Sequence, residues 1–373
     1  MALTITEEQK LLKDSAAEFL AMNAPVEQFR DLRDSNYKPF NENLWKQIVN
    51  MGWTSLTISE EFDGLDFGFV GLGQVLEEMG KTLTKAPLFS SIVLGATALN
   101  NSSNQKLKET WLPMLMDGFK RIAFAQDEHN YFDPTAIVTS AKKSSDGFLI
   151  SGKKTMVIDG AGADAFIVVA RTDDGEPALF LVNSSAKGVS LTSEILLDAG
   201  TYASVTFNNV EVTANDRISD VGNGTVLLNQ ILNTASICLA SEMLGIVKEA
   251  FSQTVEYLKE REQFGKRIGS YQALQHRAAI MFSEIELCKS IVITALQALD
   301  NESNNLDELA SLAKAKLGKT IKLVTNAAMP MPGGLGVTDA ANIGFYFKRA
   351  RVLQRLFGDY HFHLDRYARY HKY

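Results

Sequence analysis

The hydrophobic pattern of this chain changes its period twice, and these changes restrict the possible folds more than any other feature of the sequence. Up to about residue 121, apolar residues recur every three or four positions, as on one face of an α-helix. Short alternating runs separated by turns follow up to about residue 224, as is typical of β-strands. Helical spacing then returns. We therefore expect an N-terminal helical domain over 1–121, a middle β-sheet or barrel domain over 122–224, and a C-terminal helical bundle of the four-helix type over 225–373.

The connections between the strands predict the kind of sheet. Turns such as Asp173-Asp174-Gly175 join them without an intervening helix, which favours antiparallel pairing. A parallel nucleotide-binding sheet would need a helix between successive strands. The flanking parts also carry helix end signals, since Thr6-Glu7-Glu8-Gln9 fits a capping box and Thr225 is a candidate cap for a long helix towards Arg261. The expected class is α+β with several domains.

The composition excludes several classes of function. Of the 373 residues 44 are acidic and 37 basic, and the net charge of −7 opposes nucleic-acid binding driven by bulk electrostatics. Two cysteines cannot form a disulfide framework. Five scattered histidines lack metal-ligand spacing, and His361 and His363 are more typical of a helix surface or a subunit contact. With neither a signal peptide nor a spanning helix expected, we predict a cytoplasmic protein without a metal or a membrane partner.

The most distinctive stretch ends the long helix and reads Arg261-Glu262-Gln263-Phe264-Gly265-Lys266-Arg267-Ile268-Gly269. Its glycines allow a sharp turn. The guanidinium of Arg261 matches the oxygens of a phosphate, and Phe264 offers a ring on which a base can stack. On spacing alone, an ordinary helix end whose basic residues complement the helix dipole is the more common explanation.

A glycine-rich stretch near the C-terminus is the second candidate, Met331-Pro332-Gly333-Gly334-Leu335-Gly336-Val337-Thr338. Three glycines in four residues let backbone N–H groups approach a phosphate closely. It is not a Walker loop, because no Gly-Lys-Ser/Thr follows and no βαβ unit surrounds it. Taken alone, an ordinary turn between two helices is again the more common explanation.

In their order along the chain, these segments closely resemble the acyl-CoA dehydrogenase family. The strongest similarity lies in Tyr257-Leu258-x-x-Arg261-x-Gln263-Phe264-Gly265-x-x-Ile268-x-x-Tyr271-Gln272-x-x-Gln275-His276. Further matching segments cover nearly the whole chain, among them Glu60-Glu61-Phe62-Asp63-Gly64-Leu65, Glu77-Glu78-Met79-Gly80, Ser151-Gly152-Lys153-Lys154, Asn209-Val210-Glu211-Val212 and Gly333-Gly334-Leu335-Gly336. The family's α–β–α architecture agrees with the periods read from the sequence.

The resemblance implies FAD-dependent oxidation of the Cα–Cβ bond of an acyl-CoA thioester, as in fatty acid or sterol degradation. In the family a carboxylate removes the α proton while the β hydrogen passes as hydride to the flavin. By position, the motif after the long helix and the glycine-rich loop would contact the pyrophosphate and adenosine of a neighbouring subunit's FAD. The residues so implied are Arg261, Gln263, Phe264, Gln272, Gly333, Gly334 and Gly336.

The chain departs from the family where the catalytic base should lie. Many members carry a glutamate just before a glycine near the C-terminus, and here Phe357 stands before Gly358. Other members carry the glutamate on the long helix after the sheet, where the aligned residue is Ala235. Neither side chain can accept a proton. Glu242 and Asp359 are nearby carboxylates, but neither occupies a matching position.

The segments that face the flavin in the family also differ. The Trp-Ile-Thr/Ser-Asn run corresponds to Met156-Val157-Ile158-Asp159, which lacks the tryptophan and the hydroxyl. The Thr-Glu-Pro run corresponds roughly to Gln126-Asp127-Glu128, and Pro330 replaces the glutamine before the Gly-Gly loop. The adenosine side of the FAD site is therefore expected to be better kept than the flavin side.

These departures leave three interpretations. The chain is one subunit of a heteromeric enzyme, like family members that handle sterol side chains, and a paralogous subunit supplies the base. It is a homomeric dehydrogenase whose base has moved to Glu242 or Asp359. Or it is a structural or CoA-binding subunit without turnover. We expect acyl-CoA as substrate, a dimer or tetramer with FAD at the interface, and, from the family, an electron-transfer flavoprotein as acceptor.

Overall fold

The computed structural model describes residues 4–35, 39–331, 336, 338–339 and 341–373. Its contacts divide the chain into two compact units, each built from stretches that are distant in sequence. One unit contains Met1–Arg30, Phe69–Thr84 and Ser236–Tyr373, and the other contains Asp31–Gly68 and Lys85–Ala235.

The order of elements confirms the predicted α+β class, with helices on both sides of a run of strands. The first helices are α1 (Glu7–Asn23), α2 (Val26–Asp34), α3 (Glu42–Asn50), α4 (Gly68–Thr82), the π-helix η3 (Phe89–Ala96), α5 (Thr97–Asn100) and α6 (Gln105–Met116). The strands are β1 (Ile122–Ala125), β2 (Ser140–Lys143), β3 (Gly147–Ile158), β4 (Ala165–Thr172), β5 (Pro177–Asn183), β6 (Val189–Ile195) and β7 (Thr201–Thr213). The remaining elements are α7 (Gly224–Glu260), β8 (Glu262–Gln263), β9 (Lys266–Arg267), α8 (Gln272–Asp300), α9 (Leu306–Ala328), α10 (Ile343–Leu353) and α11 (Tyr360–Tyr370).

The strands from β1 to β7 form one sheet in the order β1-β4-β2-β3-β7-β6, with β5 also paired to β4. Four pairings are antiparallel, as the turns predicted: β2 with β3, β3 with β7, β6 with β7 and β4 with β5. However, β1 and β2 both run parallel to β4. The sequence did not reveal these two pairings, because alternation has the same period in parallel and antiparallel strands.

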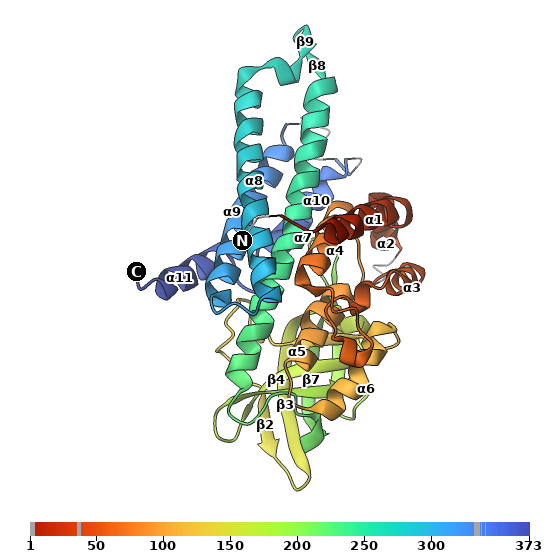
Figure 1. Cartoon of the computed structure of the whole chain (residues 1–373), viewed down its shortest axis with the longest axis vertical. Helices are drawn as coiled ribbons and strands as arrows, with labels where there is room; N and C mark the ends of the chain where they lie inside the picture. Colours follow the sequence, from red (N-terminus) through yellow and green to blue (C-terminus); the bar gives the residue numbers. More distant parts are fainter. Residues whose placement is uncertain (1–3, 36–38, 332–335, 337, 340) are drawn as a thin grey trace. The chain divides into compact units, whose positions relative to one another are not determined.

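The long helices of the other unit form the predicted bundle. Figure 1 shows α7 and α8 side by side, joined at one end by β8 and β9. On the other side of α8 lies α9, which also packs against α10 and α11. The buried residues of α9 include Leu309, Ala313, Leu317 and Ile321, which recur at helical spacing. At the start of the chain the predicted capping box is present, since the Gln9 amide donates to Thr6 Oγ1 at 3.2 Å.

Among the described residues, α7 is the helix long and apolar enough to cross a membrane by length and composition. However, 89% of its most apolar window is buried inside the protein. That degree of burial is the property of a core helix.

A buried carboxylate links three separate stretches of the bundle unit. Glu77 of α4 is 4% exposed and accepts from Lys13 Nζ of α1 at 2.8 Å and from Lys248 of α7. Burial alone would raise the pKa of Glu77, but the two lysines outweigh it and hold that pKa below its usual value. The carboxylate is therefore charged at neutral pH and requires both lysines.

Small residues let α4 and α7 approach closely beside this ion pair. A Cβ added at Gly245 of α7 would lie 1.9 Å from the Glu77 carbonyl oxygen, and one at Gly80 of α4 would lie 2.3 Å from that of Glu242. Because both obstructing atoms belong to the backbone, no side-chain rotation can relieve the overlap.

We predict that Gly245→Ala lowers the free energy of unfolding by about 1–3 kcal/mol, the usual cost of overpacking. The matched control is Gly344→Ala in α10, where an added Cβ meets no atom within 4 Å. Alanine there should raise stability by up to about 1 kcal/mol through helix propensity. Urea denaturation followed by circular dichroism measures both, and equal stabilities for the two variants would contradict the close approach.

Candidate functional site

A two-stranded hairpin extends from the end of α7 and carries the Arg261 motif. Within it, Glu262 pairs with Arg267 in antiparallel register. The two residues at the turn, Phe264 and Gly265, have φ angles of 55° and 78°. Positive φ at both positions is typical of a type I′ turn, whose twist matches that of the paired strands. The sharp turn expected from Gly265 is thus present.

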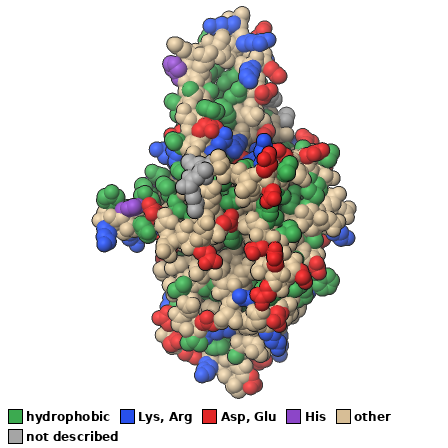
Figure 2. Space-filling view, viewed as in Figure 1, with side chains coloured by type: hydrophobic (Ala, Val, Ile, Leu, Met, Phe, Trp, Pro, Cys, Tyr) green, Lys and Arg blue, Asp and Glu red, His purple; other side chains and the backbone are tan. Residues whose placement is uncertain are grey.

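The hairpin presents unpaired groups to its surroundings. Phe264 lies at the turn and is 90% exposed. The Arg261 guanidinium makes no hydrogen bond or ion pair with a described residue. Figure 2 shows basic side chains at this end of the α7–α8 pair. An aromatic ring held open by the backbone, next to a free guanidinium, is suited to contact a molecule outside this chain.

Two further predicted residues lie beside the hairpin in the fold. Tyr271 Oη donates to the Gln263 carbonyl oxygen at 3.4 Å, and Gln272, the first residue of α8, is exposed next to it. The structure therefore brings the Arg261 motif and Gln272 together.

The predicted glycine-rich loop is described only in part. Gly336 is described and buried, whereas Gly333 and Gly334 lie outside the described residues.

Both family positions for the base are apolar and closed to solvent. Phe357 is 7% exposed and Ala235 is fully buried. Phe357 and the following Gly358 both adopt positive φ, 55° and 98°, in the turn between α10 and α11.

The two alternative carboxylates are already engaged. Glu242 Oε1 accepts from Arg349 at two nitrogens, Nη2 at 2.7 Å and Nε at 2.9 Å. Asp359 Oδ1 accepts from the backbone N–H of Phe362 at 3.0 Å and so caps α11. Each carboxylate thus has a structural partner, and sequence reasoning did not foresee either contact.

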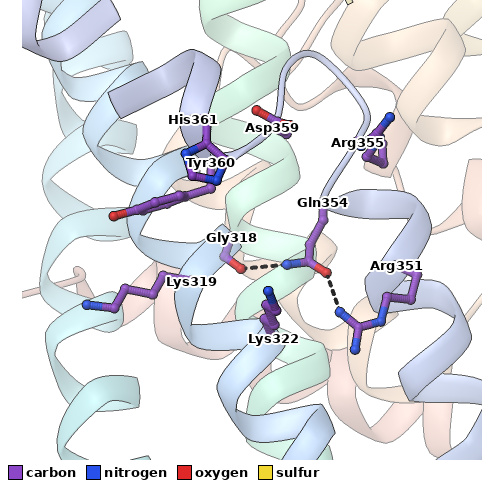
Figure 3. Close-up of a pocket in the computed structure, with 9 residues that line it drawn as sticks. All are labelled: Gly318, Lys319, Lys322, Arg351, Gln354, Arg355, Asp359, Tyr360 and His361. Atoms are coloured by element: carbon purple, nitrogen blue, oxygen red, sulfur yellow. Dashed lines mark hydrogen bonds between the residues drawn. The ribbon is translucent and has the colours of Figure 1, made fainter. Parts of the chain in front are cut away.

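A pocket of about 540 Å³ lies between α9 and the α10–α11 turn (Figure 3). Its charged lining consists of Lys319, Lys322, Arg351, Arg355 and Asp359. Lys319, Lys322 and Arg355 form no ion pair with any described residue. The first turn of α11 also borders the pocket and adds partial positive charge. Four cations facing one carboxylate suit a phosphate-bearing ligand.

The side-chain amide of Gln354 links the two sides of this pocket through two hydrogen bonds. Gln354 Nε2 donates to the Gly318 carbonyl oxygen at 2.8 Å, and Gln354 Oε1 accepts from Arg351 Nη1 at 3.1 Å (Figure 3). Sequence reasoning missed the pocket. The available signal was the spacing, because Lys319 and Lys322, like Arg351 and Arg355, lie three or four positions apart and so point to one side.

A second pocket, of about 500 Å³, borders α1, α4, α7 and α8 and includes Lys13, Lys248 and Lys289. Here each lysine already has a carboxylate partner, Glu77 or Glu286. It therefore offers no free charge comparable to that of the first pocket.

The strand segments that differ from the family also have unusual geometry. Met156 and Asp159 have positive φ, and the pairing of β3 with β7 shifts register between Lys154 and Val157. Such bulges redirect side chains at the end of a strand.

A buried charge cluster lies beside this bulge in the sheet unit. Lys154 is fully buried and donates to Glu128 Oε1 at 2.6 Å and to the Gln126 carbonyl oxygen at 3.0 Å. Burial, partly offset by Glu128, lowers the pKa of Lys154 to about 8. Asp127 Oδ1 makes no hydrogen bond with a described residue, and burial, opposed by Lys154, raises the pKa of Asp127 to about 7.

Comparison with known proteins identifies the family and the fold. The sequence matches the model of the acyl-CoA dehydrogenase N-terminal domain over residues 6–119 and that of the C-terminal domain over 222–370. The chain belongs to the acyl-CoA dehydrogenase family. The isovaleryl-CoA dehydrogenase of Bos taurus is 30% identical over 79% of this chain and 72% of that protein. The short/branched chain specific acyl-CoA dehydrogenase of the same species is 26% identical over 94% and 82%.

Solved structures of acyl-CoA dehydrogenases share the whole architecture. The ChsE4-ChsE5 complex from Mycobacterium tuberculosis matches with a TM-score of 0.92 and 25% identity, over 100% of this chain and 99% of that one. A Tcur3481-Tcur3483 steroid ACAD variant matches with a TM-score of 0.88 and 28% identity, over 97% of each chain. The predicted family and fold are confirmed.

Family membership makes this chain a flavoprotein oxidoreductase by descent and confirms FAD as the expected cofactor. The structure fits the nucleotide half of FAD, because the hairpin and the cationic pocket both present unpaired cations. The flavin half fits less well, since the bulged segment of the sheet carries Met156 and Ile158 where the family resemblance places a tryptophan and a hydroxyl residue.

The raised pKa of Asp127 predicts a pH-dependent stability. The folded state holds a proton on this carboxyl up to about pH 7, whereas the unfolded chain releases it near pH 4. The contribution of Asp127 to stability is therefore full below about pH 4 and is lost as the pH rises to 7. We expect Asp127→Asn to gain stability relative to the wild type between pH 4 and 7, measured by urea unfolding. Asp146→Asn, at an exposed turn, is the control, and parallel curves for wild type and Asp127→Asn would contradict the buried acid.

Proposed function

We propose that this chain takes part in the FAD-dependent α,β-dehydrogenation of an acyl-CoA thioester as one subunit of an oligomer, with its hairpin inserted into a neighbour's FAD site. The supporting observation is that one bundle carries two separate sets of cations that form no ion pair with described residues. The Arg261 hairpin lies at one end of α7, while the cationic pocket lies at the α10–α11 turn.

The hairpin cannot serve the pocket of its own chain. Arg349 of α10 bonds Glu242 on α7, and 18 residues of helix separate Glu242 from Glu260, where the hairpin begins. At 1.5 Å per residue that is about 27 Å. A two-residue turn cannot return Phe264 across this distance, which supports a role for the hairpin in another subunit's site.

Each set of residues has a distinct role in holding the cofactor. In the neighbour's site, Arg261 would pair with phosphate oxygens and Phe264 would stack on the adenine. In this chain's own pocket, Lys319, Lys322 and Arg355 would neutralise the pyrophosphate at the start of α11. FAD supplies the acceptor for the β hydride in this family's reaction.

The base is proposed to come from a paralogous partner. Phe357 and Ala235 cannot accept a proton, and Glu242 and Asp359 are engaged by Arg349 and by the α11 N-terminus. Both the ChsE4-ChsE5 structure and the Tcur3481-Tcur3483 structure are named for two chains, and a further relative is named as a subunit of the caffeyl-CoA reductase-Etf complex of Acetobacterium woodii. Ile280, Phe282 and Leu287 on α8 are more than half exposed and suit burial in such an assembly.

The buried Phe357 and Ala235 also favour a second candidate, a structural or CoA-binding subunit that completes the partner's FAD site without turnover of its own. The two differ in whether acyl-CoA reduces the flavin bound in this chain's own pocket. For either candidate we keep two proposals from the sequence, the division into 1–121, 122–224 and 225–373 and a cytoplasmic location. An electron-transfer flavoprotein remains the proposed acceptor.

Removing the hairpin's free groups should release FAD from the assembled enzyme. We expect Arg261→Ala to weaken FAD retention by about tenfold or more, since a charged hydrogen bond contributes roughly 1.5–3 kcal/mol. Phe264→Ala should have a similar effect, since stacking of a base on an aromatic ring contributes roughly 1–3 kcal/mol. Flavin absorbance after gel filtration measures it. Lys259→Ala, on the exposed end of α7, is the control and should retain FAD. Full retention in both hairpin variants would contradict the proposal.

The location of the base can be tested by exchange of the α proton of bound acyl-CoA in deuterated water. Glu242→Gln should leave the rate of the heteromer unchanged. Asp359→Asn keeps the cap of α11 and should change the rate by less than tenfold. Replacing the partner's glutamate should lower it by about 100-fold or more, as loss of a general base does. A loss of that size in Glu242→Gln or Asp359→Asn would instead place the base in this chain.

A further inference from the structure

A buried lysine that forms no ion pair with any described residue lies against the turn that lines the cationic pocket. Lys314 of α9 is 1% exposed, and its Nζ donates to the carbonyl oxygens of Leu353 at 3.0 Å and Gly358 at 2.8 Å, with that of Gln354 at 3.5 Å. A buried ammonium is costly unless its protons are bonded. Here the acceptors are carbonyls at the C-terminal end of α10 and in the following turn, where a cation complements the helix dipole.

These carbonyls belong to the segment that forms one side of the pocket. Gln354, Arg355 and Asp359 line the pocket (Figure 3). Lys314 bonds the backbone on either side of Arg355, at Leu353 and at Gly358. Within this turn, Phe357 and Gly358 adopt positive φ, which is a costly conformation for phenylalanine. The turn therefore needs support from outside itself.

A second buried side chain supports the same turn. His363 of α11 is 1% exposed, and its Nε2 donates to the Phe357 carbonyl oxygen at 2.8 Å. A Cβ at Gly358 would lie 3.0 Å from that nitrogen and 2.5 Å from the Phe362 ring. Lys314 and His363 thus fix consecutive carbonyls of the turn from two different helices.

We propose that Lys314 is a positioning residue, which holds the α10–α11 turn in the form that presents Arg355 and the start of α11 to the phosphates of a nucleotide diphosphate. This inference rests on the proposed function, in which the pocket takes the ADP half of FAD. None of the contacts of Lys314 reaches the ligand, so its effect passes through the turn.

The charges around Lys314 make this support depend on pH. Burial lowers the pKa of Lys314 to about 7, opposed by Asp359. Burial, with Lys314 adding to it, lowers the pKa of His363 to about 3, so that ring stays neutral. Further charged groups on the packed elements are Lys319, Lys322, Arg351 and Arg355 towards the pocket. Among the described pairs, Arg366 contacts Asp307 on α9, Lys316 contacts Glu284 on α8, Arg369 contacts Asp365, and His371 contacts Glu308.

A bound anion favours the protonated amine, so binding takes up part of a proton and weakens as the pH rises above 7. The neutral amine also has only two N–H donors for three carbonyls. The expected fall in affinity is up to about tenfold, which corresponds to a shift of one pKa unit on binding.

The test measures ADP binding to the full chain by calorimetry at pH 7, 8 and 9. The wild type should lose affinity across this range. Lys314→Met should bind at least tenfold more weakly at pH 7 and show little further loss. Lys316→Met, on the same helix and paired with Glu284, should behave as the wild type.

If Lys314→Met fails to fold, Lys314→Arg decides the question, because a guanidinium stays charged at every pH used. Its ADP affinity should not fall between pH 7 and 9. A fall equal to that of the wild type, or wild-type binding by Lys314→Met, would overturn the positioning role. No ADP binding by the wild type at any pH would overturn the assignment of the pocket itself, which separates that failure from the failure of Lys314.

Discussion

The bundle unit depends on one buried carboxylate. Glu77 joins α4 to Lys13 of α1 and to Lys248 of α7, which are distant in sequence. A buried ion pair of this kind adds little net stability, but loss of one partner is costly because the other charge stays buried. The contact joins three stretches of the bundle unit, so each of them must be in place for the charge to be satisfied. At Gly245 the close approach of α4 and α7 leaves no room for a side chain.

This bundle carries the two surfaces that we propose for nucleotide binding. The hairpin continues from α7, and the pocket lies between α9 and the α10–α11 turn, so both belong to the same bundle. The family's base positions, in contrast, have become part of the apolar interior, as Phe357 and Ala235 show. Under the proposed function, this chain holds the dinucleotide and lacks the group that removes the α proton. That combination is our reason for proposing an enzyme divided between two subunits.

Much of the fold could be predicted because the spacing of apolar residues follows from which side of each element is buried. The stripe from Leu309 to Ile321 and the box at Thr6 lie where the sequence placed them. The parallel pairing of β4 was not predictable, since alternation does not encode strand direction. The hairpin residues were found through their motif. The cationic pocket was not found from the sequence. Lys319 and Arg355 are far apart in the chain, and only the folded bundle brings them together. Buried Lys314 has no pattern that distinguishes it from an exposed lysine.

The exposed Phe264 has a consequence for how the protein behaves when scarce. If a cofactor site is completed by a ring from another chain, its occupancy follows the association equilibrium as well as the concentration of free flavin. Dilution would then empty the site even in excess flavin, and flavin would in turn hold the subunits together. Bound FAD would then stabilise the association of the chains. The amount of active enzyme would depend on the concentrations of both subunits.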